Sequence, residues 1–65
     1  MRILVNGAWH ETQRDELAGA LEELGYGGAV VSTAVNGEFI AAAQRARTVL
    51  AEGDRIEVVA PMQGG

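Results

Sequence analysis

Apolar and polar residues alternate near both ends of the chain, with the two-residue period of a strand that buries one face. The alternation covers residues 1–5 and residues 55–58. It predicts that four apolar side chains face the core: Ile3, Val5, Ile56 and Val58. The charged positions between them should face solvent: Arg2, Arg55 and Glu57. Both ends of the chain are therefore expected to lie in one sheet.

Two Asn-Gly pairs interrupt the apolar runs, and Asn-Gly is the strongest short sequence feature of a β-hairpin. The turns are expected at Asn6-Gly7 and Asn36-Gly37. The strands that they join are residues 1–5 and 8–11, and residues 29–35 and 38–40. A further turn at Gly53-Asp54 would precede the last strand.

Leucines between the two hairpins recur at a helical spacing. Leu17, Leu21 and Leu24 stand at positions i, i+4 and i+7, which places them on one apolar stripe. The Thr12 hydroxyl is expected to cap this helix, and Gly25 is expected to end it as the first residue beyond the helix. Residues 41–51 fit a short helical turn followed by a connection.

The predicted order is β-β-α-β-β-β in a chain of 65 residues. This order and length indicate an α+β fold of the ubiquitin-like β-grasp type, with a mixed four- to five-stranded sheet curled around one main helix. We expect one domain over residues 1–60 and a flexible tail over residues 61–65.

Composition excludes several classes of function. The chain has no cysteine and one histidine, His10, so no zinc centre is expected. A net charge of −4 argues against nucleic acid as a partner. The longest apolar run, residues 39–43, is far too short to span a bilayer, and no signal peptide is recognised. We therefore expect no membrane partner and a cytoplasmic location.

The chain ends in Gly64-Gly65, after a strand and Pro61-Met62. Such an end has two interpretations. It could be an ordinary frayed terminus. Alternatively, two residues without Cβ atoms could carry a terminal carboxylate into a channel too narrow for other side chains.

Four sequence blocks decide between these interpretations. MRILVNG (residues 1–7), AVNGEFI (34–40), LAEGDRIEVV (50–59) and the final Gly-Gly resemble, in order and spacing, the ThiS family of ubiquitin-like sulfur carriers in thiamine (thiazole) biosynthesis. The chain departs from the family at residues 41–44, where Ala-Ala-Ala-Gln replaces a common Pro-Arg pair. Its segment between the first hairpin and the helix is also shorter than usual.

The resemblance implies chemistry at the Gly65 carboxylate, with Gly64 providing clearance around it. A ThiF-like adenylating enzyme would activate Gly65, and a cysteine-desulfurase-derived persulfide would convert it to a thiocarboxylate. A ThiG-like thiazole synthase would then accept the sulfur. ATP and magnesium would belong to the activating enzyme. The chain would bind no cofactor or metal of its own, and it would be a protein co-substrate with no catalytic residue.

Two alternatives to this function stay open. One is a sulfur carrier of the same fold for another pathway, such as MoaD-like molybdopterin synthesis, cysteine synthesis or tRNA thiolation; the short chain favours thiamine. The other is a ubiquitin-like protein modifier or an interaction module.

Trp9 has two possible environments. A two-residue type I′ turn at Asn6-Gly7 would pair Trp9 with Leu4 on the face away from the helix, whereas a bulged turn would place Trp9 in the core. On the outer face, an apolar docking patch for a partner would comprise four residues: Leu4, Trp9, Val59 and Met62. His10 is expected to be a structural residue, and Arg45 and Arg47 are expected to be solvated loop charges.

Overall fold

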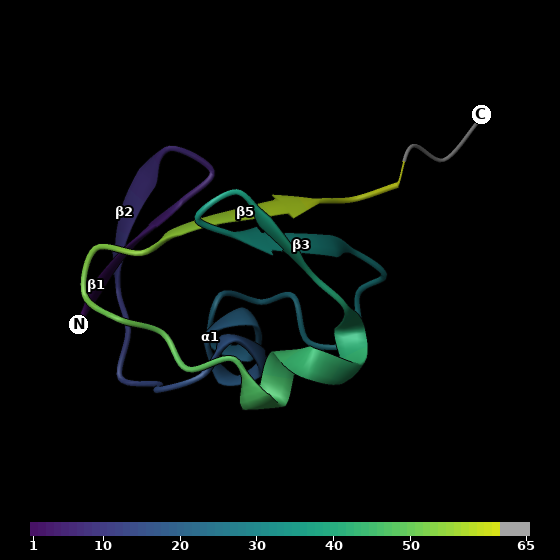
Figure 1. Cartoon of the computed structure of the whole chain (residues 1–65), viewed down its shortest axis with the longest axis horizontal. Helices are drawn as coiled ribbons and strands as arrows, with labels where there is room; N and C mark the ends of the chain where they lie inside the picture. The colour runs from purple at the N-terminus through teal and green to yellow at the C-terminus, as the bar shows by residue number, and fades with distance from the viewer. Residues whose placement is uncertain (62–65) are drawn as a thin grey trace.

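Two hairpins and a final strand form one mixed five-stranded sheet, and the helix α1 (Leu17–Glu23) covers one face of it (Figure 1). The structure is a computed structural model that describes residues 1–61. The strands are β1 (Arg2–Val5), β2 (Ala8–Glu11), β3 (Ser32–Val35), β4 (Glu38–Ile40) and β5 (Arg55–Val59). Their order is β2-β1-β5-β3-β4, with β5 parallel to β1 and the other pairs antiparallel. The last strand is thus the central one.

Both hairpins turn at the predicted Asn-Gly pairs. Asn6 and Gly7 have φ angles of 49° and 84°, and Asn36 and Gly37 have 51° and 84°. Positive φ at both central residues is typical of a type I′ turn, which matches the right-handed twist of the strands that it joins. This turn fixes the register of the first hairpin, in which Leu4 lies opposite Trp9.

The helix α1 (Leu17–Glu23) packs its leucine stripe against the sheet. The buried apolar residues are Ile3, Val5, Leu17, Ala20, Leu21, Leu50, Ile56 and Val58. They include all four strand residues predicted to face the core. Gly25, with a φ of 94°, ends the helix as predicted, and its N–H donates to the carbonyl of Glu22 at 3.0 Å. The next N–H, of Tyr26, donates to the carbonyl of Leu21 at 2.8 Å, which completes a Schellman motif.

The predicted start of the helix is wrong. Thr12 does not cap it: the Thr12 hydroxyl oxygen accepts from the N–H of Arg14, and Glu16 is the N-cap, accepting from the N–H of Gly19 at 3.0 Å. Glu16 forms an isolated antiparallel bridge with Val49. This bridge holds the chain extended until Leu17, so the helix begins four residues later than a cap at Thr12 would have it.

The connection after β4 forms a 3₁₀ helix, η1 (Ala42–Arg47), as expected for a short helical turn. Arg45 on η1 is not a solvated charge. Its Nε donates to the Thr33 hydroxyl at 3.1 Å and its Nη2 donates to the Val31 carbonyl at 2.6 Å. The third strand also begins at Ser32 and not at residue 29, because its partner β5 ends at Val59, opposite Ser32.

Candidate functional site

The central strand β5 leads directly to the predicted reactive end of the chain. It ends at Val59, two residues before Pro61 (Figure 1). Gly64, Gly65 and Met62 lie outside the described residues, so the reactive carboxylate, its clearance and most of the flexible tail over residues 61–65 stay predictions. What the structure does describe is the support from which that tail leaves.

The side chains of both turn asparagines bind the backbone of β5. Asn6 Oδ1 accepts from the N–H of Val58 at 2.9 Å, and Asn6 Nδ2 donates to the Val58 carbonyl at 3.1 Å. Asn36 Oδ1 accepts from the N–H of Arg55 at 2.9 Å. The central strand is therefore attached near both of its ends by side-chain amides as well as by its neighbouring strands.

Trp9 lies on the outer face of the sheet, opposite Leu4, with 52% of its surface exposed. The type I′ turn thus settles its position in favour of the surface. The guanidinium carbon of Arg2 lies 4.6 Å from the centre of the Trp9 ring, a cation–π contact. Trp9, Leu4 and Arg2 form one cluster on this face, since Arg2 and Leu4 alternate with the buried residues of β1.

Val59 lies further along the sheet than this cluster. Leu4 is opposite Arg55 in β5, whereas Val59 is opposite Ser32 in β3. Arg55 and Val59 are four residues apart, which corresponds to roughly 13 Å along a strand. The structure therefore brings Leu4 and Trp9 together but places Val59 near the exit of the tail.

Phe39 is an exposed aromatic residue whose face in the sheet was not predicted from the sequence. It is 68% exposed on β4 and lies opposite Ala34, which in turn lies opposite Glu57. The alternation of Phe39 with the partly buried Ile40 could have indicated this position. Phe39 and Val59 are therefore both exposed on the outer face. Val59 is on β5 itself, and Phe39 on β4 lies on the side of β5 opposite to Trp9.

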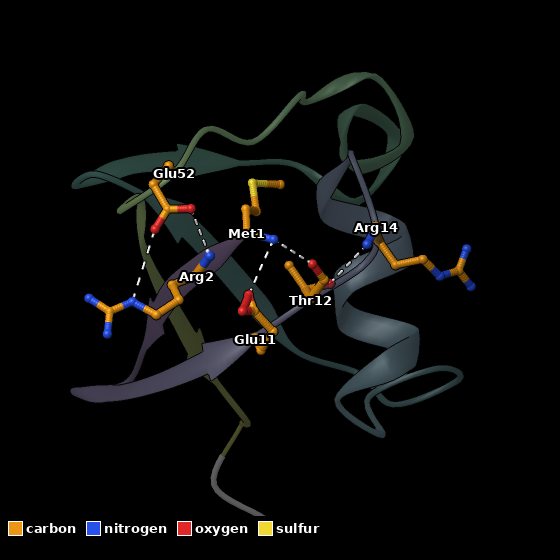
Figure 2. Close-up of polar contacts among 6 residues, drawn as sticks. All are labelled: Met1, Arg2, Glu11, Thr12, Arg14 and Glu52. Carbon is orange, nitrogen blue, oxygen red and sulfur yellow. Dashed lines mark hydrogen bonds and ion pairs between the residues drawn. The ribbon is translucent and has the colours of Figure 1, made fainter.

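The N-terminal residues are held by a backbone carbonyl of the following loop and by acidic side chains (Figure 2). The Met1 ammonium donates to the Thr12 carbonyl at 2.9 Å and lies 3.3 Å from Glu11 Oε2. The N–H of Arg2 donates to Glu52 Oε1 at 3.0 Å. This anchored end is on the far side of the molecule from the end of β5 (Figure 1).

No group of three or more metal-ligating side chains occurs within residues 1–61. His10 is half-buried on β2, opposite Ile3, which fits the structural role expected for it. In the same part of the chain, no helix has the length and apolar character needed to cross a bilayer.

The last strand is central in the sheet and parallel to the first strand, and one helix covers the sheet. This arrangement defines the β-grasp class of ubiquitin-like proteins. A sequence model of the ThiS family matches residues 2–65, and the chain belongs to this family. Its structure is similar to the crystal structure of the thiamine biosynthesis protein ThiS from Geobacter metallireducens, with a TM-score of 0.83 and 26% sequence identity over 100% of both chains. No curated protein matched the chain. These matches confirm the predicted family and fold.

Proposed function

We propose that this chain is the sulfur carrier of thiamine biosynthesis and that the Gly65 carboxylate is the group that carries the sulfur. The observation that supports this most directly is the extent of the family match, which runs through residue 65 and so includes the terminal Gly-Gly. The position of β5 agrees with it, because a central strand paired on both sides is a rigid support for a reactive tail.

The chemistry needs an activated carboxylate, because a free carboxylate is a poor electrophile. A Gly65 oxygen would attack the α-phosphorus of ATP, with pyrophosphate leaving, to give an acyl adenylate. A persulfide sulfur would then attack the carbonyl carbon and displace AMP, and a thiol would reduce the remaining sulfur–sulfur bond to leave the thiocarboxylate. ATP and magnesium would be bound by the activating enzyme.

The partners that this chemistry requires are a ThiF-like adenylating enzyme, a cysteine-desulfurase-derived persulfide donor and a ThiG-like thiazole synthase. The outer face of the sheet offers them the cluster of Leu4, Trp9 and Arg2 and, nearer the tail, Val59. Exposed apolar residues beside a charged residue are typical of surfaces that bind other proteins. The chain itself would supply the reacting carboxylate and no catalytic group.

The proposal is tested by intact-mass measurement after incubation with a ThiF-like enzyme, ATP, magnesium and a persulfide donor. We expect the mass to rise by the difference between oxygen and sulfur. A variant with one alanine added after Gly65 is the matched control, because it moves the carboxylate without touching the domain; it should gain no sulfur.

Two results would contradict the proposal. The first is an unchanged mass with an activating enzyme that thiolates another carrier in the same assay. The second is equal sulfur gain by the extended variant. A ladder of heavier covalent conjugates, in place of sulfur gain, would indicate a ubiquitin-like modifier. Sulfur transfer to a molybdopterin, cysteine or tRNA pathway, and none to thiazole synthase, would indicate a carrier of another pathway.

A further inference from the structure

We propose that Asn6 is a positioning residue for the reactive tail, because its side-chain amide holds the last part of β5 in line with the sheet. This inference rests on the proposed function, since it concerns how the tail is presented to the activating enzyme. It assigns a role in presenting Gly65 to a turn residue that is distant from Gly65 in the sequence.

The need for such a residue follows from the unequal lengths of β1 and β5. β1 ends at Val5 and the chain turns away at Gly7, but β5 continues to Val59. In a parallel pair, the N–H and carbonyl of Val58 would face the continuation of β1. Without that continuation, both groups would lack a partner from the backbone of β1.

The Asn6 side chain takes the place of the missing strand. Its Oδ1 accepts from the Val58 N–H at 2.9 Å and its Nδ2 donates to the Val58 carbonyl at 3.1 Å. Its backbone N–H donates to the Ile56 carbonyl at 2.9 Å, which fixes the position of Asn6 itself. On the opposite side of β5, Val59 pairs with Ser32. The end of the strand is therefore held from both sides.

Asparagine suits this position for two reasons. The turn requires positive φ, 49° at Asn6, which asparagine, aspartate and glycine adopt more readily than other residues. The two bonds to Val58 require an acceptor and a donor on one short side chain, and of these three residues only asparagine provides both. Glycine would keep the turn without either bond, and aspartate would keep only the acceptor.

Asn36 offers an internal comparison at the opposite end of the same strand. It occupies the same place in a second type I′ turn, with a φ of 51°. Its Oδ1 accepts from the Arg55 N–H at 2.9 Å, and its Nδ2 donates to Asp54 Oδ1 at 3.0 Å. The two asparagines thus bind β5 through similar bonds, but only Asn6 binds the end from which the tail leaves.

The effect on function depends on the fraction of molecules in which the end of β5 stays paired with the sheet. If the end of β5 separates from the sheet, the tail samples more directions and a smaller fraction of molecules presents it correctly. The apparent affinity falls by that fraction, while the bound complex still reacts at the normal rate. Loss of the Asn6 bonds should therefore raise KM for adenylation and leave kcat nearly unchanged.

The test compares Asn6→Gly with Asn36→Gly in the full chain. We expect Asn6→Gly to raise KM about five- to tenfold and Asn36→Gly to change it less than about twofold. Both variants lose side-chain bonds to β5, two at Val58 and one at Arg55. Amide hydrogen exchange measured by NMR is the second readout. Asn6→Gly should lose protection at Val58 and Val59, relative to the core amide of Ile56, and Asn36→Gly should keep it.

Equal KM increases in the two glycine variants, or unchanged Val58 protection in Asn6→Gly, would overturn the proposal. If Asn6→Gly does not fold, Asn6→Asp replaces it, because the acceptor for the Val58 N–H is retained while the donor is lost; an unchanged KM in that variant would also count against the proposal. If the wild-type chain gains no sulfur, the proposed function has failed. The exchange comparison then decides alone whether Asn6 orders the end of β5.

Discussion

At the scale of single residues, the Asn6-Gly7 turn decides the surroundings of Trp9. Because both turn residues have positive φ, the register is fixed and Trp9 lies opposite Leu4 on the outer face. A register shifted by one residue would have sent it to the core. This position follows from the sequence once the type of turn is known.

Trp9 is the only tryptophan, so its fluorescence reports on this one site. With 52% of its surface exposed, we expect red-shifted emission that acrylamide quenches readily in the native state. Replacing the stacked Arg2 by alanine should increase the quenching further, because the guanidinium covers part of the ring at 4.6 Å. Replacing exposed Arg55 by alanine is the control. Blue-shifted, protected emission from the native protein would contradict the outer-face position.

The bonds made by Asn6 could not be predicted from the sequence. An Asn-Gly pair predicts a turn, but it does not show which strand the asparagine side chain will reach. Asn6 and Val58 are 52 residues apart in the sequence. They meet only because β5 pairs with β1 and extends beyond the end of β1. The sequence allowed the Leu4–Trp9 pair as one of two alternatives, and the turn geometry decides for it. The reactive tail stays a prediction, and the support of the tail by Asn6 could not be predicted.

At the scale of elements, local patterns predicted the strands and turns well, and long-range pairing decided the remaining boundaries. The C-terminus of α1 follows from Gly25, whose requirement for positive φ is local. The N-terminus depends on a bridge between Glu16 and Val49, which no local pattern contains. For this reason the start expected at Thr12 was wrong and the end at Gly25 was right.

The 3₁₀ helix η1 is attached to β3 by a single arginine. Arg45 binds the hydroxyl of Thr33 and the carbonyl of Val31, and Thr33 in turn donates to the Ile40 carbonyl at 2.8 Å. Lysine has one ammonium group in place of the planar fork and cannot make both bonds with the same geometry. Arg45→Lys should therefore lower the free energy of unfolding by about 1–2 kcal/mol in urea titrations.

Arg47 is the matched control for this substitution, because it lies in the same η1 helix and is exposed. Arg47→Lys should change the free energy of unfolding by less than about 0.5 kcal/mol. Equal effects of the two substitutions would show that the bonds of Arg45 to β3 do not contribute to stability.

At the scale of the whole molecule, a chain of 65 residues has little stability to lose. A domain of this size has a free energy of unfolding of about 3–10 kcal/mol. One helix covers the sheet, so its largest fully buried side chain, Leu17, contributes a large part of the core. The fold is therefore sensitive to single truncations under α1.

We expect Leu17→Ala to cost about 2–5 kcal/mol and to leave a substantial unfolded fraction at 37 °C, measured by circular dichroism. Leu24→Ala, on the same stripe but only partly buried, should cost less. Comparable losses for the two variants would contradict the position of Leu17 at the centre of the core.

The anchored N-terminus has a consequence for the reactivity of the molecule toward itself. The sequence contains no lysine, so the Met1 ammonium is the one aliphatic amine of the chain. That amine is bound to Thr12 and Glu11, on the far side from the end of β5. An acyl adenylate is an acylating reagent, and its ordinary side reaction is amide formation with a free amine. A carrier built in this way would expose no lysine to its activated terminus, and its α-amine is already bound by Thr12 and Glu11.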